Sequence, residues 1–323
     1  MPNVPYLDSV GHYQTPDLLQ KWTFSQGVGV LIGGGRRGNN CLNGGNGAIS
    51  KTFDGEYSTL CCGSASKHNT NGTPLSLSNS ISGISCGMRQ VGDGRFVMAT
   101  HVGFGTAVSP PILFDRWFYL EMKVVVTPTT ISADFWINEK HVLSDGVSWP
   151  TPILHHVGWS SFGIGFPGGG DDAQAGDIYV DAVDTPYGDV NIDALHPNGP
   201  TSNAAWVPSP TVANWINVSD IYPDGDTTTV ASTVVNDLDL YTLEHVPAGI
   251  VIRALQGVAS VKKDTAGLAA LKLQYGSGDG ALWSEEIYPS EGAYFMARDG
   301  RKDPALLALL AANGMVFGQK RTQ

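Results

Sequence analysis

The segment DRWFYLEMKVVV (residues 115–126), followed by TPTTISADFWINEKHVL (residues 127–143), decides the fold class of this chain. In the first run, every second residue is apolar and falls on one side: Phe118, Leu120, Met122 and Val124. A polar connection at 127–130 leads to a second apolar run, and a turn at 138–140 leads to a third. Alternation with a period of two is typical of strands, so the segment predicts an antiparallel hairpin plus a third strand with one covered face.

Composition agrees with a mainly β protein of two domains. The chain has 323 residues, of which 40 are glycine, and only 15% are charged against a usual value of about 25%. Abundant glycine fits many tight turns between short strands. The net charge is −11, and an acidic chain gains nothing from phosphate contacts, so we expect no nucleic-acid partner.

Neither a secretory leader nor a membrane span is visible in the sequence. The longest apolar run, residues 306–312, is far shorter than the ~20 residues that a spanning helix needs. We therefore expect no membrane insertion.

The four cysteines, Cys41, Cys61, Cys62 and Cys86, form no CxxC pair and have no histidines at zinc spacing. Cys61 and Cys62 would point to opposite faces of a strand. Buried, reduced thiols are the simpler interpretation. A disulfide between Cys41 and one of the vicinal pair is the alternative.

The chain divides into three predicted parts. Residues 1–26 are expected to form an extended N-terminal arm, residues 27–187 the larger β domain, and residues 188–323 a smaller β module. The module should carry one helix over 304–313, with Asp303 as its N-cap, Pro304 in the first position and Gly314 at its end.

Several of these segments resemble a known family. The central hairpin, GDIYVDAV (176–183) and DTPYG (184–188) resemble strands of concanavalin-like (laminin-G-type) jelly rolls. The segments 188–200 and DLDLY (237–241) resemble a region of tailed-bacteriophage structural proteins. The resemblance covers most of the chain after about residue 90, and it implies a jelly-roll sandwich followed by a smaller β-sandwich module in a virion protein.

Catalytic motifs are weak. GISCG (83–87) matches the nucleophile elbow G-x-S-x-G, but the residues that follow cannot form the helix that this motif requires. Asp177 and Asp181 share a face of one predicted strand, yet their Cα atoms would lie about 13 Å apart at ~3.3 Å per residue. That separation is too large for the carboxylate pair of a retaining glycosidase, so we expect a protein that is not an enzyme.

Two kinds of binding site are considered. Asp171, Asp172 and Asp177 lie in or beside a glycine-rich loop and are candidate calcium ligands, because Ca²⁺ takes several carboxylate and carbonyl oxygens. The tryptophans of the larger domain are too many to share one core face. Those that remain exposed could stack on sugars or on a neighbouring subunit, and the candidates are Trp136, Trp149 and Trp159.

These observations lead to one main hypothesis and one alternative. The main hypothesis is a non-enzymatic structural component of a tailed-phage particle, in the tail, fibre, collar or head decoration. It would be assembled in the host bacterial cytoplasm, would contact other virion proteins and would form a homo-oligomer, most readily a trimer. The alternative is a carbohydrate-binding module that attaches the particle to host glycans. A cluster of exposed aromatic and carboxylate or amide side chains at a rim would favour the alternative.

Overall fold

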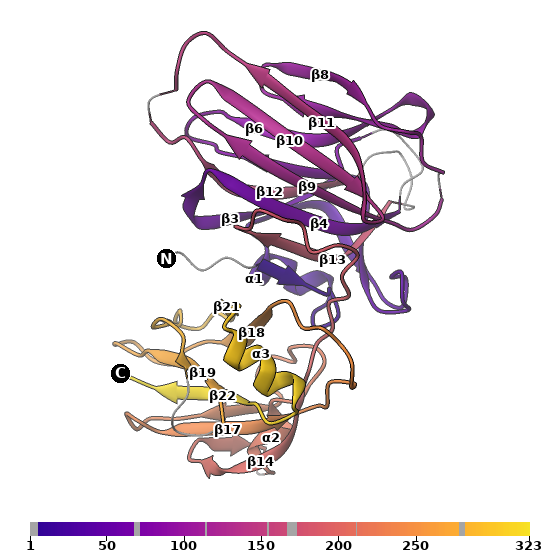
Figure 1. The fold of residues 1–323 in the computed structure, drawn as a ribbon. Helices are drawn as coiled ribbons and strands as arrows, with labels where there is room; N and C mark the ends of the chain where they lie inside the picture. The colour runs from indigo at the N-terminus through magenta and orange to yellow at the C-terminus, as the bar shows by residue number, and fades with distance from the viewer. Residues whose placement is uncertain are drawn as a thin grey trace. The chain divides into compact units, whose positions relative to one another are not determined.

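The chain folds into two compact units. The computed structural model describes residues 6–67, 72–113, 115–153, 155–166, 173–210, 212–277 and 282–323. Unit 1 is Met1–Asp193 and unit 2 is Ala194–Gln323 (Figure 1). The boundary falls six residues after the predicted one, because Val190 and Ile192 pack against buried side chains of unit 1.

Unit 1 is a two-layer antiparallel sandwich. One layer has the order β11-β10-β9-β4-β13 with β1 beside β13, and the other has the order β3-β12-β5-β6-β7-β8 with β2 beside β3. Its strands are β1 (Tyr6–Asp8), β2 (Phe24–Leu31), β3 (Cys41–Tyr57), β4 (Thr59–Lys67), β5 (Leu75–Ser78), β6 (Ser85–Val91), β7 (Arg95–Thr100), β8 (Gly103–Val108), β9 (Phe118–Val126), β10 (Thr130–Ile137), β11 (Lys140–Ser148), β12 (Trp159–Phe166) and β13 (Gln174–Asp181). Strand β3 joins the layers, because it pairs with β13 near its start and with β12 further along.

The core of unit 1 lies between the two layers. The inward side chains of both layers are buried there, among them Leu120, Met122 and Val124 of β9, Met88 of β6 and Phe162 of β12. At the far edges the layers approach again, since Asp145 of β11 accepts a hydrogen bond of 2.8 Å from the Ala107 N–H of β8. The prediction of a mainly β, jelly-roll sandwich is confirmed.

The predicted hairpin and third strand are present as β9, β10 and β11, side by side in Figure 1. The expectation of one covered face is wrong for the middle of this layer. Tyr119 and Glu121, which point outward from β9, are as buried as their inward neighbours. The segment 183–192, which we call the strap, lies over this face and buries Val183, Tyr187 and Val190 against it.

The N-terminal segment differs from the predicted arm. It forms β1 on the edge of β13, the 3-10 helix η1 (Thr15–Asp17) and the short helix α1 (Leu18–Lys21). The Asp8 carboxylate is fully buried and accepts hydrogen bonds from Tyr13 (2.6 Å) and Trp22 (3.0 Å). It also forms an ion pair with Lys21 (3.2 Å). These contacts fasten the segment to the sandwich.

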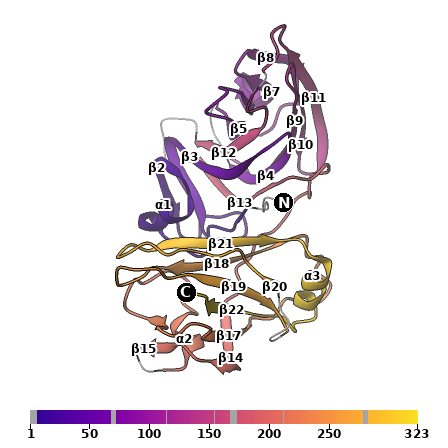
Figure 2. The same cartoon turned by 90° about the vertical axis from the view of Figure 1, so that its left-hand side faces the viewer.

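Unit 2 is a smaller β module. A sheet of order β14-β17-β22-β19-β20 packs against the pair β18-β21, two neighbouring strands in Figure 2. The elements are β14 (Pro197–Ala204), β15 (Val207–Ser209), α2 (Asn214–Asn217), β16 (Thr229–Ala231), β17 (Leu238–Leu243), β18 (Leu255–Val261), β19 (Leu271–Gly276), β20 (Leu282–Trp283), β21 (Phe295–Arg301), α3 (Pro304–Ala311) and β22 (Val316–Arg321). Among the described residues, no helix is long and apolar enough to cross a membrane.

Helix α3 begins as the sequence predicts and ends earlier. The Asp303 side chain accepts hydrogen bonds from the N–H groups of Ala305 (2.9 Å) and Leu306 (3.1 Å), which confirms the N-cap. The helix ends at Ala311, and Asn313, with φ of +56°, takes the left-handed position that was expected for Gly314. The Asn313 side chain also accepts from Val246 N–H (2.6 Å), which explains why an asparagine stands there.

Candidate functional site

The three candidate tryptophans have different fates in the structure. Trp159 is fully buried in β12 and touches no solvent, so its predicted role in glycan or partner contact is wrong. Trp149 is half-buried, donates its indole N–H to the Pro128 carbonyl (3.0 Å) and packs edge-on against His101. Trp136 is half-buried on the outward face of β10, and its surroundings make it the best candidate.

The three predicted calcium ligands also have different outcomes. Asp171 and Asp172 lie outside the described residues, so their part stays a prediction. Asp177 is buried and is engaged by Arg37 (3.5 Å), Arg36 (3.8 Å) and the Ile192 N–H (3.1 Å). Two cations already neutralise this carboxylate, which does not suit it to a metal. Within the described ranges, no group of three or more His, Cys, Asp or Glu side chains could hold a metal ion.

A compact polar cluster adjoins Trp136, with Asp134 on the same strand β10 and His141 and Ser144 on the neighbouring strand β11. The Trp136 and His141 rings meet edge to face, with centroids 5.1 Å apart. The Ser144 hydroxyl donates to Asp134 Oδ1 (2.5 Å) and lies 3.0 Å from His141 Nε2. Asp134, His141 and Ser144 are all open to solvent. We call these four residues the Trp136 platform.

Strand pairing brings the platform together. Asp134 and Trp136 are two residues apart on β10, so both point outward. Across the pair, Asp134 faces Ser144 and Trp136 faces His141, with a bulge after Phe135 that adds one residue to β11. The bulge brings the imidazole of His141 beside the indole of Trp136.

The two-residue turn that joins β10 to β11 fixes this arrangement. Asn138 and Glu139 both adopt positive φ (+48° and +64°), as a tight hairpin turn requires. The Asn138 side chain accepts from the Tyr119 N–H of β9 (2.8 Å). The Glu139 carboxylate accepts from the Asp189 N–H of the strap (3.2 Å), so the turn is tied on two sides.

The strap borders the platform on the side opposite β11. Glu121 pairs with Trp136 across β9 and β10, and its carboxylate accepts from the Gly188 N–H (2.9 Å) and the Tyr179 hydroxyl (2.5 Å). Burial raises the pKa of the Glu121 carboxyl above its usual value, although these two hydrogen bonds oppose the shift. The carboxylates under the strap are therefore structural groups closed to solvent, and the open chemistry lies on the platform.

The platform contains serine, histidine and aspartate, but it is not a catalytic triad. In a triad, the nucleophile and the acid occupy opposite nitrogens of the imidazole. Here Ser144 and Asp134 both approach the same nitrogen, Nε2 of His141, at 3.0 and 3.4 Å. Ser144 also donates directly to Asp134, so the hydroxyl is not activated by the imidazole.

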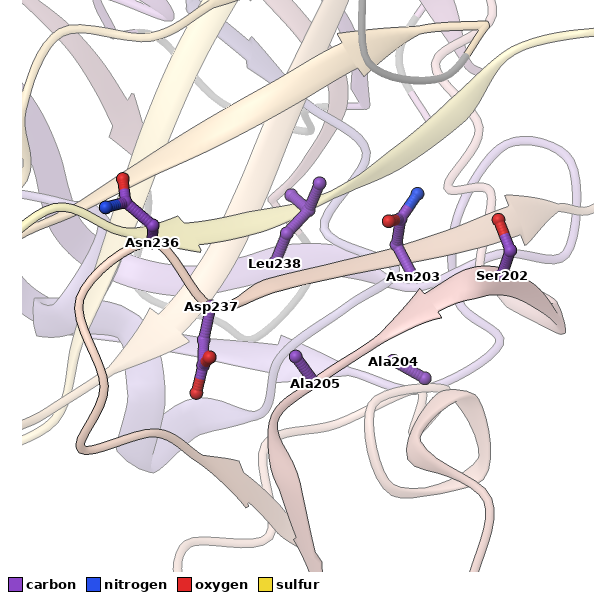
Figure 3. A pocket seen from close by; sticks show the side chains of 7 residues that line it. All are labelled: Ser202, Asn203, Ala204, Ala205, Asn236, Asp237 and Leu238. Carbon is purple, nitrogen blue, oxygen red and sulfur yellow. The ribbon is translucent and has the colours of Figure 1, made fainter.

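Unit 2 contains a second, weaker candidate, a hollow of about 340 Å³ between the end of β14 and the start of β17. Figure 3 shows Asn203 and Asn236 pointing to one side of it and Asp237 to the other. The remaining lining residues are Ser202, Ala204, Ala205 and Leu238. The lining has no aromatic ring and no cation, so it offers a ligand only neutral hydrogen bonds and one carboxylate.

Sequence reasoning found Trp136 and missed the other members of the platform. Asp134 could have been predicted as a neighbour of Trp136, because it lies two positions earlier and alternate residues of a strand share a face. His141 and Ser144 could not be placed without the register of β10 against β11, which the bulge after Phe135 shifts by one residue.

Comparisons with known proteins give likeness at the level of structure only. No protein-family model and no curated protein sequence matches this chain. Among solved structures, it resembles domain 4 of AbnA, an arabinanase of Geobacillus stearothermophilus, in complex with arabinotriose, at 12% identity and a TM-score of 0.34 over 47% of this chain and 74% of that one. It also resembles the carbohydrate-binding module CBM66 of Bacillus subtilis, at 11% identity and a TM-score of 0.26 over 43% and 82% of the two chains.

A third similar structure is the exoplasmic/lumenal domain of VIP36 with Ca²⁺ and Man3GlcNAc, at 9% identity and a TM-score of 0.33 over 58% of this chain and 95% of that one. All three likenesses are too low to carry an argument about function. What this chain does has to be argued from the chemistry of the platform.

Proposed function

We propose that this protein is a non-enzymatic glycan-binding β-sandwich and that the Trp136 platform is its binding surface. The observation that carries the proposal is an outward indole bordered by an open carboxylate, an imidazole and a hydroxyl on one rigid hairpin. An aromatic face packs against the C–H groups of a sugar ring, while a carboxylate accepts hydrogen bonds from its hydroxyls. This is the type of cluster that separates a carbohydrate-binding module from a flat assembly interface.

The architecture around the platform supports the same proposal. Asn138 anchors the turn to β9, and Glu139 and Glu121 anchor its neighbourhood to the strap. A site held by hydrogen bonds on several sides loses little conformational entropy when a ligand binds. Pre-organisation of this kind matters for sugars, which offer many weak contacts and few strong ones.

Glycan-array screening followed by calorimetric titration of the best ligand tests the proposal. Trp136→Ala should weaken binding about 30-fold, equivalent to the ~2 kcal/mol or more of an aromatic contact that dominates an interface. Tyr288→Ala is the matched control, because Tyr288 is an exposed aromatic of unit 2. If the intact protein binds no glycan, or if Trp136→Ala binds as the parent does, the proposal is wrong.

A second candidate function, assembly with other copies or with virion proteins, is favoured by a different observation. The edge strands of the second layer expose large apolar side chains, Phe24 on β2 and Val102, Phe104 and Val108 on or beside β8. Exposed apolar edges are common at sites of association. The tailed-phage role, the trimer and the virion location stay predictions. Light scattering on the eluting protein decides whether a symmetric oligomer exists, and a clean monomer would count against assembly.

A further inference from the structure

The Asp134 carboxylate of the platform carries a negative charge that no lysine or arginine in the described part of the chain neutralises. Its contacts, from Ser144 (2.5 Å) and His141 (3.4 Å), both fall on Oδ1. Among the residues that the structure describes, no lysine or arginine forms an ion pair with Asp134. The second oxygen is therefore available to a ligand, as an acceptor only.

The charged groups around Asp134 also favour ligands that donate hydrogen bonds over ligands that carry negative charge. Lys123 pairs with Asp134 across β9 and β10, but its ammonium lies 3.6 Å from Asp184. Lys140 pairs with the inward Ile137, so it belongs to the opposite face of the hairpin. Glu139 adds a further exposed carboxylate beside the turn. The cation that faces Asp134 across the two strands is thus already paired with another carboxylate, and Glu139 adds negative charge beside the turn.

We propose that the platform selects neutral, hydroxyl-rich sugars and rejects anionic ones, such as sialylated, uronic or sulfated glycans. This inference rests on the proposed glycan-binding function and names its ligand class. A neutral sugar satisfies the Asp134 acceptor with hydroxyl donors. A sugar carboxylate or sulfate placed at the same point would face Asp134 with no donor and with repulsion between like charges.

The size of the effect follows from Coulomb's law. Two like charges about 5 Å apart repel enough to weaken binding about fourfold even at the dielectric constant of water, and more at the lower effective dielectric constant of a protein surface. The Debye length falls from ~10 Å at 0.1 M salt to ~3 Å at 1 M, so the discrimination should shrink at high salt. Loss of a hydrogen-bond donor, in contrast, does not depend on salt.

The experiment compares a neutral oligosaccharide that the protein binds with the same oligosaccharide carrying one sialic or uronic acid. Titrations are run at pH 8, above the usual range of histidine charging, in 50 mM and in 1 M salt. The expected result is at least fivefold tighter binding of the neutral ligand, with a smaller gap in 1 M salt. Asp134→Asn, which removes the charge and keeps the shape, should bring the two affinities within about twofold.

Asp54→Asn serves as the control, because Asp54 is an exposed carboxylate elsewhere in unit 1 and should leave the ratio unchanged. Thermal melting shows that each variant is folded. Equal or tighter binding of the anionic ligand by the parent overturns the inference while the glycan-binding function stands. If the glycan array that supplies the neutral ligand finds no glycan bound, the function and the inference are overturned together.

Discussion

Replacement of Asp8 by Asn should destabilise unit 1 strongly, although Asp8 lies in a segment that the sequence suggested was a free arm. The carboxylate is fully buried and receives donors from Val10, Tyr13, Trp22 and Lys21 at 2.6–3.2 Å. Burial alone would raise the pKa of Asp8, but Lys21, His12 and the hydrogen bonds outweigh it and hold the pKa below its usual value. The charged form is therefore the one that the fold stabilises.

The magnitude follows from what the substitution leaves behind. Lys21 is itself only 2% exposed, so Asp8→Asn leaves a buried ammonium without its carboxylate. Removal of one partner of a buried pair costs about 3–5 kcal/mol. For a unit of this size, each kcal/mol shifts the melting temperature by about 2–4 °C, so the loss should be about 6–20 °C.

Urea unfolding and thermal melting at pH 7 measure this loss. Lys21→Met should also destabilise, and the double variant Asp8→Asn/Lys21→Met should lose less than the sum of the two, since neither charge then remains buried alone. Asp54→Asn, on the surface, should change stability by less than about 0.5 kcal/mol. A loss below about 1 kcal/mol for Asp8→Asn would show that the carboxylate is solvated and that the N-terminal segment is not fastened as described.

Three further predictions concern the strap and the thiols. The pKa of Glu121 is raised in the folded state, so its contribution to stability is fully present below about pH 4.3, the usual pKa in an unfolded chain. That contribution is lost as the pH rises through the pKa of the folded state, and Glu121→Gln should flatten this part of a stability–pH curve measured by urea unfolding. Arg36 holds Asp189 and approaches Asp177, so Arg36→Ala should speed hydrogen exchange at Gly188 and Asp189 more than in the β9–β10 ladder. An equal change at both places would show that Arg36 does not hold the strap. All four cysteines are buried and free, and burial raises the pKa of Cys41, Cys61 and Cys86 to about 12, so a thiol reagent at pH 8 should react only after denaturation; prompt reaction of the native protein would show that the thiols are accessible.

The local pattern of the chain was sufficient to predict the three strands β9, β10 and β11 and the start of the last helix. Alternation in residues 115–143 predicts β9, β10 and β11, because a half-buried strand must place every second side chain in the core. Asp303 and Pro304 mark the start of α3. An N-cap needs a side-chain acceptor, and proline suits the first position because a backbone N–H there would have no partner within the helix. These features depend only on residues within a few positions along the chain, so they can be predicted without knowledge of the tertiary structure.

Burial and site membership were decided only by contacts between distant segments. Nothing near Tyr119 or Glu121 signals that residues 183–192 will cover them, and nothing near Trp159 distinguishes its buried ring from the outward ring of Trp136. The platform itself depends on one bulge, which sets His141 beside Trp136. The sequence by itself determined which residues can form strands and which can bind. The tertiary structure decided which of them meet and which stay open to solvent, because strand register and layer packing involve residues far apart along the chain.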